Sequence, residues 1–197
     1  MEKYKSRIAD EILERKLKGK GAVLIEGPKW CGKTTTAEQI SKSVLYMADP
    51  ANGEQNLTLA DINPSLLLTG DTPRLIDEWQ LAPKLWDAIR FEVDHRGEEG
   101  QFILTGSAVP VDSKKRVHTG TGRFSWLLMR PMTLYESGES TGTVSLKDLF
   151  DGLSTINGIN NLSLEDIAYL CSRAGWARRI FLDKEIALDS AFDYYDA

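Results

Sequence analysis

The sequence GAVLIEGPKWCGKTTT, at residues 21–36, decides the fold of this protein. Its first part, residues 21–26, is a short apolar run with the length and β-branching of a buried strand. The pattern that starts at Lys33 is helical. Between them, residues 27–34 match G-x-x-x-x-G-K-[ST]. The stretch therefore predicts a strand, a glycine-bearing turn and a helix in direct succession.

This turn has the chemistry of a phosphate-binding loop (P-loop). Gly27 and Gly32 permit backbone conformations and a close approach that a Cβ would block. Backbone N–H groups of such a loop and of the following helix face a polyphosphate. Lys33 supplies a positive charge to the β and γ phosphates, and the Thr34 hydroxyl ligates Mg²⁺. We expect these residues to bind the nucleotide: Gly27, Pro28, Lys29, Trp30, Cys31, Gly32, Lys33, Thr34 and Thr35.

Further strands and helices extend the pattern along the chain. Four more segments are typical of strands: residues 43–48, 73–78, 101–106 and 124–130. A helix is predicted between the third and fourth strands of the chain by the i+4 spacing of Leu81, Leu85, Ile89 and Val93. Strands that alternate with helices predict an α/β fold with a parallel sheet covered on both faces. Ligands of such sheets bind at the carboxyl ends of the strands.

The chain divides into three regions by pattern. Residues 1–20 contain an amphipathic helix, residues 21–150 the P-loop core, and residues 151–197 a small, helical, lid-like region. In the last region, Ser163 and Asp166 have the spacing of a capping box. We expect these boundaries to separate the parts of the fold.

Acidic residues at the end of the third strand suit ATP hydrolysis. In RLIDEWQ, Asp77 ends an apolar strand, where a carboxylate can hold Mg²⁺ through its water shell. Glu78 follows directly and is the expected general base for the attacking water. Thr105 and Ser107, at the tip of the fourth strand, are candidate hydroxyl donors to the attacking water and the γ phosphate. These residues together predict a catalytic site beside the P-loop.

Arg123 is the candidate for stabilising transition-state charge. It stands immediately before the fifth strand, and a guanidinium meets the charge that develops on a transferred phosphoryl group, in many P-loop enzymes from a neighbouring subunit. Arg116 and Arg130 compete for this role. Whether Arg123 acts within its own chain or on a neighbour stays open at this point.

Tryptophan and cysteine residues lead to separate expectations. Trp86 and Trp126 lie in apolar runs and are expected in the core. Trp30 lies inside the loop, where its ring is expected to be exposed and close to the nucleotide. Cys31 is close to a helix N-terminus, a position that lowers a thiol pKa, but without a histidine partner a catalytic thiol is not expected.

Composition excludes several classes of protein. With 24 basic and 29 acidic residues the net charge is −5, which gives no global attraction to nucleic acid or to an anionic membrane. No apolar stretch approaches the ~18 residues that span a bilayer. Two cysteines form no disulfide framework, so we expect a reduced, cytoplasmic protein. The Asn-Lys-x-Asp base reader of GTPases is absent from the sequence.

Five segments together resemble one family: residues 21–39, 75–90, 102–108, 118–124 and 129–140. They are similar to the bacterial and archaeal AAA+ superfamily ATPases in which the ATPase domain is followed by a C-terminal domain of unknown function. This resemblance implies a five-stranded sheet in the order 5-1-4-3-2, ATP with Mg²⁺, and hydrolysis. It implies that Gly32, Lys33 and Thr34 bind phosphate and magnesium, that Asp77 and Glu78 are the Walker B acids, and that Thr105 or Ser107 is the sensor. It also implies a longer chain, so that residues 151–197 are expected to be the start of a lid.

Three functions are consistent with these residues. The first is an ATPase whose hydrolysis drives a conformational change, with homo-oligomers expected from the AAA+ resemblance. The second is a nucleotide-dependent switch or adaptor that hydrolyses ATP very slowly and regulates a partner, which the sequence does not name. The third, a small-molecule kinase, lacks an evident acceptor pocket or arginine-rich lid in the sequence.

Overall fold

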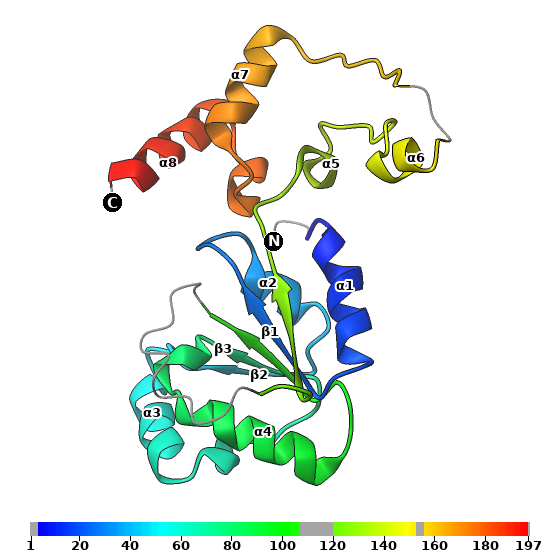
Figure 1. The fold of residues 1–197 in the computed structure, drawn as a ribbon. Helices are drawn as coiled ribbons and strands as arrows, with labels where there is room; N and C mark the ends of the chain where they lie inside the picture. Colours follow the sequence, from blue (N-terminus) through cyan, green and yellow to red (C-terminus); the bar gives the residue numbers. More distant parts are fainter. Residues whose placement is uncertain (1–3, 107–119, 153–155, 197) are drawn as a thin grey trace. The chain divides into compact units, whose positions relative to one another are not determined.

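A computed structural model describes residues 4–106, 120–152 and 156–196 of the chain. The chain forms two compact units (Figure 1). One comprises residues 7–130, and the other comprises residues 1–6 with residues 131–197. These units differ from the boundaries expected at residues 20 and 150, because the first helix packs on the sheet and the second unit begins directly after the last strand.

The unit of residues 7–130 is built on a five-stranded parallel sheet. The strand order is β2-β3-β4-β1-β5, which confirms the α/β P-loop fold and the order 5-1-4-3-2. The strands are β1 (Ala22–Glu26), β2 (Ser43–Tyr46), β3 (Arg74–Asp77), β4 (Phe102–Thr105) and β5 (Phe124–Leu128). Since β1 lies between β4 and β5, the loop that follows it emerges at the carboxyl edge of the sheet, next to the end of β4.

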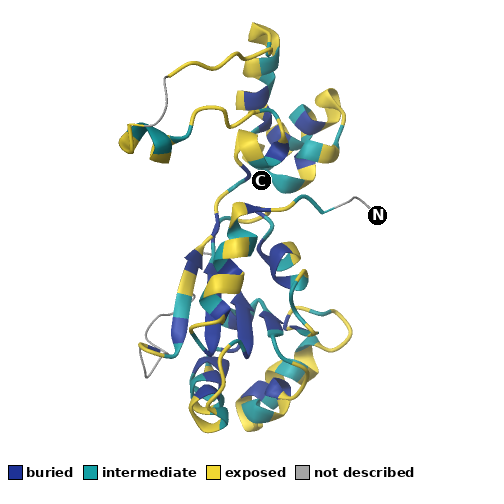
Figure 2. Ribbon diagram, turned by 90° about the vertical axis from the view of Figure 1, so that its right-hand side faces the viewer, coloured by how far each residue is buried: buried dark blue, intermediate teal, exposed yellow. Residues whose placement is uncertain are grey.

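Helices cover both faces of this sheet. They are α1 (Ile8–Leu17), α2 (Lys33–Glu38), α3 (Gly53–Ile62) and α4 (Lys84–Arg96), with short 3₁₀ helices η1 (Pro64–Leu68) and η2 (Trp79–Leu81). Successive side chains of a strand point to opposite faces, and β1 divides its residues accordingly. Ala22 and Leu24 join the core under α4, whereas Val23 and Ile25 join the core under α1 and α2. Figure 2 shows the strands as the most buried part of this unit.

Helix α4 begins later than its apolar spacing predicted. Leu85, Ile89 and Val93 are buried, but Leu81 lies in η2 and is exposed. Pro83 directly precedes the helix, and Gly97 ends it in the left-handed conformation (φ 66°) that glycine tolerates. Helix α3 was not predicted, because its single buried residue, Ala60, leaves no apolar stripe in the sequence.

Of the two tryptophans expected in the core, Trp86 is buried and Trp126 is not. Trp86 is completely buried and stacks on Phe124 with ring centroids 4.0 Å apart. The expectation for Trp126 is wrong, because its side chain is 41% exposed. It lies on β5, an edge strand of the sheet, where burial is incomplete.

The second unit is a small group of helices. They are α5 (Leu134–Ser137), α6 (Leu146–Phe150), α7 (Leu164–Arg173), the 3₁₀ helix η4 (Ala177–Phe181) and α8 (Lys184–Asp196). The capping box is confirmed, because Ser163 Oγ accepts from the Asp166 N–H (3.1 Å) and Asp166 Oδ2 accepts from the Ser163 N–H (3.2 Å). Within the described residues, no helix is both long enough and apolar enough to cross a bilayer.

Candidate functional site

Residues 27–32 form a tight loop between β1 and α2. Gly27 (φ 156°) and Gly32 (φ 98°) both have positive φ. A Cβ on Gly27 would lie 2.2 Å from the backbone oxygen of Met129, so only glycine permits the loop to approach the chain beyond β5 this closely. Trp30, which also has positive φ (63°), is 62% exposed, as expected of a ring at the surface of the loop.

Lys33 spans the loop from the first turn of α2. Its ammonium Nζ donates hydrogen bonds to the carbonyl oxygens of Gly27 and Pro28, both at 2.9 Å. The residue is only 9% exposed. The loop is therefore closed around a buried positive charge, which is the group that a polyphosphate would meet.

Asp77, at the end of β3, connects α2 with β4. Its Oδ1 accepts one hydrogen bond from the Thr34 hydroxyl (2.8 Å) and another from the Thr105 hydroxyl (2.6 Å). The sheet brings these residues together, because β4 pairs with both β1 and β3 and Thr105 lies in register with Asp77. Three residues far apart in the sequence thus meet at the carboxyl edge, whereas Ser107, the other candidate hydroxyl, lies outside the described residues.

Glu78 turns away from the strand that precedes it. Its backbone is in the left-handed region (φ 55°, ψ 41°), which is uncommon for a residue other than glycine. Its Oε2 accepts a hydrogen bond from the amide Nε2 of Gln80. A Cβ on Gly106 would lie 2.2 Å from Gln80 Oε1, so this amide also packs against the residue after Thr105. Sequence analysis missed Gln80, although its position two residues after Glu78 in RLIDEWQ was a usable signal.

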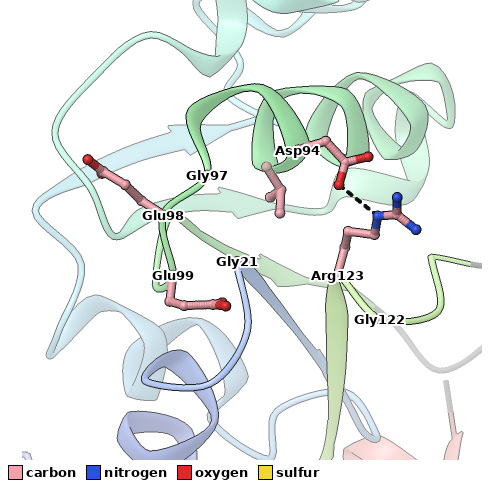
Figure 3. A pocket seen from close by; sticks show the side chains of 8 residues that line it. Gly21, Asp94, Gly97, Glu98, Glu99, Gly122 and Arg123 are labelled. Atoms are coloured by element: carbon pink, nitrogen blue, oxygen red, sulfur yellow. Dashed lines mark hydrogen bonds and ion pairs between the residues drawn. The ribbon is translucent and has the colours of Figure 1, made fainter.

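Arg123 does not lie at the P-loop of its own chain. It precedes β5, and Phe124 is in register with Ala22, at the opposite end of β1 from the loop. The five residues of β1 span roughly 13 Å at about 3.3 Å per residue. Arg123 Nε instead forms an ion pair of 2.7 Å with Asp94 Oδ1 (Figure 3). This contact raises the pKa of Arg123 and lowers the pKa of Asp94.

The Asp94–Arg123 pair lines a cavity of about 330 Å³ at the amino edge of the sheet. Glycines and acidic side chains form most of its wall: Gly21, Gly97, Gly122, Glu98 and Glu99. Figure 3 shows the Asp94 and Arg123 side chains directed toward each other. Of the two competing arginines, Arg116 lies outside the described residues. Arg130 follows β5 at the carboxyl edge, where its backbone oxygen accepts a hydrogen bond from Arg7 (2.9 Å).

The pKa of the Cys31 thiol is raised, whereas its position close to a helix N-terminus predicted a lowered pKa. Its side chain is completely buried, and burial raises the pKa of the thiol although the Lys33 and Arg7 charges act against this shift. A thiol in this state is a poor nucleophile. Cys31 therefore serves as a packing residue beneath the loop, where its Sγ contacts the backbone oxygen of Met129.

The parallel sheet in this order, with a glycine-rich loop after an internal strand, β1, defines a P-loop domain. The AAA domain family model matches residues 19–138, and the chain belongs to this family.

Two relatives share 32% identity with the chain over 136 residues: the uncharacterized protein Rv2008c of Mycobacterium tuberculosis and the uncharacterized protein Mb2031c of Mycobacterium bovis. Each alignment covers 68% of this chain and 30% of the relative. The chain thus spans about a third of the length of these relatives.

Among solved structures, AMPPCP-bound DnaA from Aquifex aeolicus is similar to 96% of the chain, with 16% identity and a TM-score of 0.49, over 59% of its own length. The AAA domain of FIGL-1 in complex with ADP matches 96% of the chain and 82% of its own length, with 14% identity and a TM-score of 0.39.

Proposed function

We propose that residues 7–130 bind ATP together with Mg²⁺ and hydrolyse the nucleotide. The observation that carries this proposal is that the hydroxyl groups of Thr34 and Thr105 both donate to Asp77 Oδ1. This carboxylate lies next to a loop that is closed around Lys33. A turn that served only to connect β1 with α2 would need glycine for its shape. It would need neither a buried ammonium group nor a carboxylate shared by two hydroxyl groups.

Phosphate binding is assigned to the loop and Lys33. In this structure the ammonium group donates to two neutral carbonyl oxygens, those of Gly27 and Pro28. Phosphate oxygens carry full negative charge, so they are stronger partners for the same donor. We expect Lys33 to exchange at least one carbonyl contact for the β and γ phosphates when ATP binds.

The residues present fit Mg²⁺. Thr34 Oγ1 and Asp77 Oδ1 are oxygen atoms of the kind that Mg²⁺ prefers, and they lie 2.8 Å apart beside the loop. Magnesium in nucleotide sites takes one or two protein oxygens, several waters and the phosphates of the substrate. When bound, the cation would neutralise charge on the β and γ phosphates. Thr34 is assigned as a direct ligand and Asp77 as a ligand through water.

Hydrolysis is assigned to Glu78, with Thr105 nearby. A carboxylate at this position can accept a proton from the water that attacks the γ phosphate. We assign the Thr105 hydroxyl, which donates to Asp77 in this structure, to contact with that water or the phosphate. Nothing in the sequence provides the Asn-Lys-x-Asp base reader of GTPases, which favours ATP as the nucleotide.

A second function, a slow nucleotide-dependent switch, is favoured by the contact between Gln80 and Glu78. The amide occupies one oxygen of the carboxylate that would activate water. If this contact persists with ATP bound, the protein holds the nucleotide for longer than an efficient ATPase would. A partner that moved Gln80 would then control the rate of hydrolysis.

Assembly and coupling belong to the same proposal. Because Arg123 lies far from its own P-loop, we assign it to the γ phosphate of a neighbouring copy in a homo-oligomer, where hydrolysis would drive a conformational change. The two cysteines are free, Cys31 buried and Cys171 exposed, in keeping with a reduced cytoplasmic environment. The net charge of −5 does not favour nucleic acid as a partner.

The proposal is tested with the purified chain by thermal unfolding and phosphate release. A ligand at about 100 times its Kd stabilises the native state by about 2.7 kcal/mol, which raises Tm by several degrees. We expect this increase with ATP and Mg²⁺, a smaller one after chelation of Mg²⁺, and none with GTP at the same concentration. Absence of any shift with ATP would overturn nucleotide binding, and binding without phosphate release would favour the switch.

A further inference from the structure

Arg7 is a buried cation behind the P-loop. It directly precedes α1, and only 6% of the residue is exposed. Its backbone N–H donates to Asp10 Oδ2 at 2.7 Å, which anchors the residue at the start of the helix. No periodicity or motif in the sequence singles it out, because its partners lie far along the chain.

The guanidinium group of Arg7 connects two backbone carbonyls at the carboxyl edge of the sheet. Nη1 donates to the oxygen of Cys31 at 2.8 Å, and Nη2 donates to the oxygen of Arg130 at 2.9 Å. Cys31 belongs to the P-loop, and Arg130 lies two residues beyond the end of β5. A planar, permanently charged fork of donors can make both contacts at once, which a lysine cannot do with the same geometry.

The contact with Cys31 bears on the orientation of the next peptide group. In a trans peptide unit the C=O of one residue and the N–H of the next point in opposite directions. By holding the Cys31 oxygen on its own side, Arg7 directs the Gly32 N–H to the other side. Gly32, at φ 98°, has a conformation open to few other residues, so an external contact that limits its freedom has a real effect.

We propose that Arg7 is a positioning residue for the P-loop. It orients the peptide group between Cys31 and Gly32 for phosphate binding and adds a positive charge close to the anion. This inference rests on the proposed function, since it concerns the ligand of the same loop. This role needs no direct contact between Arg7 and the nucleotide, because Arg7 acts through the backbone of the loop and through its charge.

A purely structural role would not require this residue type. Helix α1 is already attached to the sheet by Leu13 and Leu17, both buried in the core on that face. Methionine has a similar volume to arginine but no donor group, so the change removes the two carbonyl contacts and retains the apolar packing. Arg7→Met should therefore keep the helix in place while it releases the Cys31 oxygen.

The test measures Kd for ATP with Mg²⁺ by calorimetry, together with Tm, for the wild-type chain, Arg7→Met, Arg7→Lys and Leu13→Ala. Leu13→Ala is the control, because it weakens the packing of α1 and leaves both hydrogen bonds of the Arg7 guanidinium in place. We expect Arg7→Met to raise Kd by about tenfold or more, the effect of losing one charge-assisted hydrogen bond. Arg7→Lys should raise Kd less. Leu13→Ala should lower Tm and leave Kd within about twofold of wild type.

The outcomes separate failure of the proposed ATP binding from failure of the role proposed for Arg7. If the wild-type chain fails to bind ATP, the proposed function itself is wrong. If it binds, and Arg7→Met binds equally well or Leu13→Ala loses as much affinity as Arg7→Met, then Arg7 has only a structural role. Should Arg7→Met fail to fold, Arg7→Lys is the deciding variant, because lysine has one donor group in place of the fork. An unchanged Kd in folded Arg7→Lys protein would overturn the proposal.

Discussion

Thr34 donates its hydroxyl hydrogen to Asp77 across 2.8 Å, although the two residues are 43 positions apart in the sequence. The bond joins the first turn of α2, the helix that follows β1, to the end of β3. Strands β1 and β3 do not pair with each other. Strand β4, inserted between them, sets the separation of the two elements. In the proposed site, a cation bound directly by Thr34 Oγ1 and through water by Asp77 would replace this hydrogen bond.

Lys33→Ala should abolish tight ATP binding. The change removes a buried ammonium that donates to two loop carbonyls and would donate to phosphates instead. Loss of about two charge-assisted hydrogen bonds corresponds to a rise in Kd of about 10² or more. Calorimetry with ATP and Mg²⁺ measures the effect, and far-ultraviolet circular dichroism establishes that the fold is retained. Unchanged affinity would remove the P-loop assignment.

Glu78→Gln should keep ATP bound and slow its hydrolysis by about 10² to 10⁴, the usual contribution of a general base. The glutamine has the same shape but accepts no proton from water. Phosphate release at saturating ATP gives the rate, and Glu54→Gln, an exposed change on α3, is the matched control. Equal turnover in Glu78→Gln and wild type would place the base elsewhere.

Gln80→Ala should raise basal hydrolysis, by up to about tenfold, because it frees the Glu78 carboxylate from the amide that now donates to it. Affinity for ATP should change little, since the phosphate contacts are assigned to the loop and Lys33 and not to Gln80. Single-turnover phosphate release measures the rate, with Gln55→Ala on the exposed side of α3 as control. A lower rate would mean that Gln80 aligns Glu78 for catalysis and does not restrain it.

Arg123→Ala should lower hydrolysis by as much as ~10³ with little loss of ATP affinity, since an arginine finger acts on transition-state charge. The specific activity of the wild-type chain should rise with protein concentration. Mixing Arg123→Ala with Lys33→Ala should restore part of the activity at sites where an intact P-loop meets an intact arginine. Activity independent of concentration, with no rescue on mixing, would leave Arg123 as a surface partner of Asp94.

Trp30 should report nucleotide binding by fluorescence. Its ring is 62% exposed in the P-loop, whereas Trp79 and Trp86 are buried. Binding of ATP with Mg²⁺ should change the intrinsic emission, and Trp30→Phe should remove most of this change while Kd is retained. An undiminished signal in Trp30→Phe would identify another tryptophan, with Trp79 beside the acids as the first to replace.

The local structural features of this protein, those that depend on residues close together in the sequence, could be predicted. The strand at residues 21–26, the glycine turn and the Ser163–Asp166 capping box depend on backbone conformations and on contacts within a few residues. Helix α3 could not be predicted, because tertiary packing covers one small side chain and leaves no periodic stripe. Its stability comes from its neighbours more than from its own pattern.

The candidate site also has a part that the sequence predicts and a part that depends on the tertiary structure. The sequence by itself predicted the loop and the residues that we propose for phosphate and magnesium, since the spacing of Gly27, Gly32, Lys33 and Thr34 is typical of a P-loop. Only the tertiary structure decided which distant groups join them. The order of strands brings Thr105 and Asp77 to the P-loop, and it sends Arg123 to the other end of the sheet, where it pairs with Asp94. Arg7 reaches Cys31 for the same physical reason: contacts between residues far apart in sequence depend on which strands are neighbours, and no local pattern records that choice.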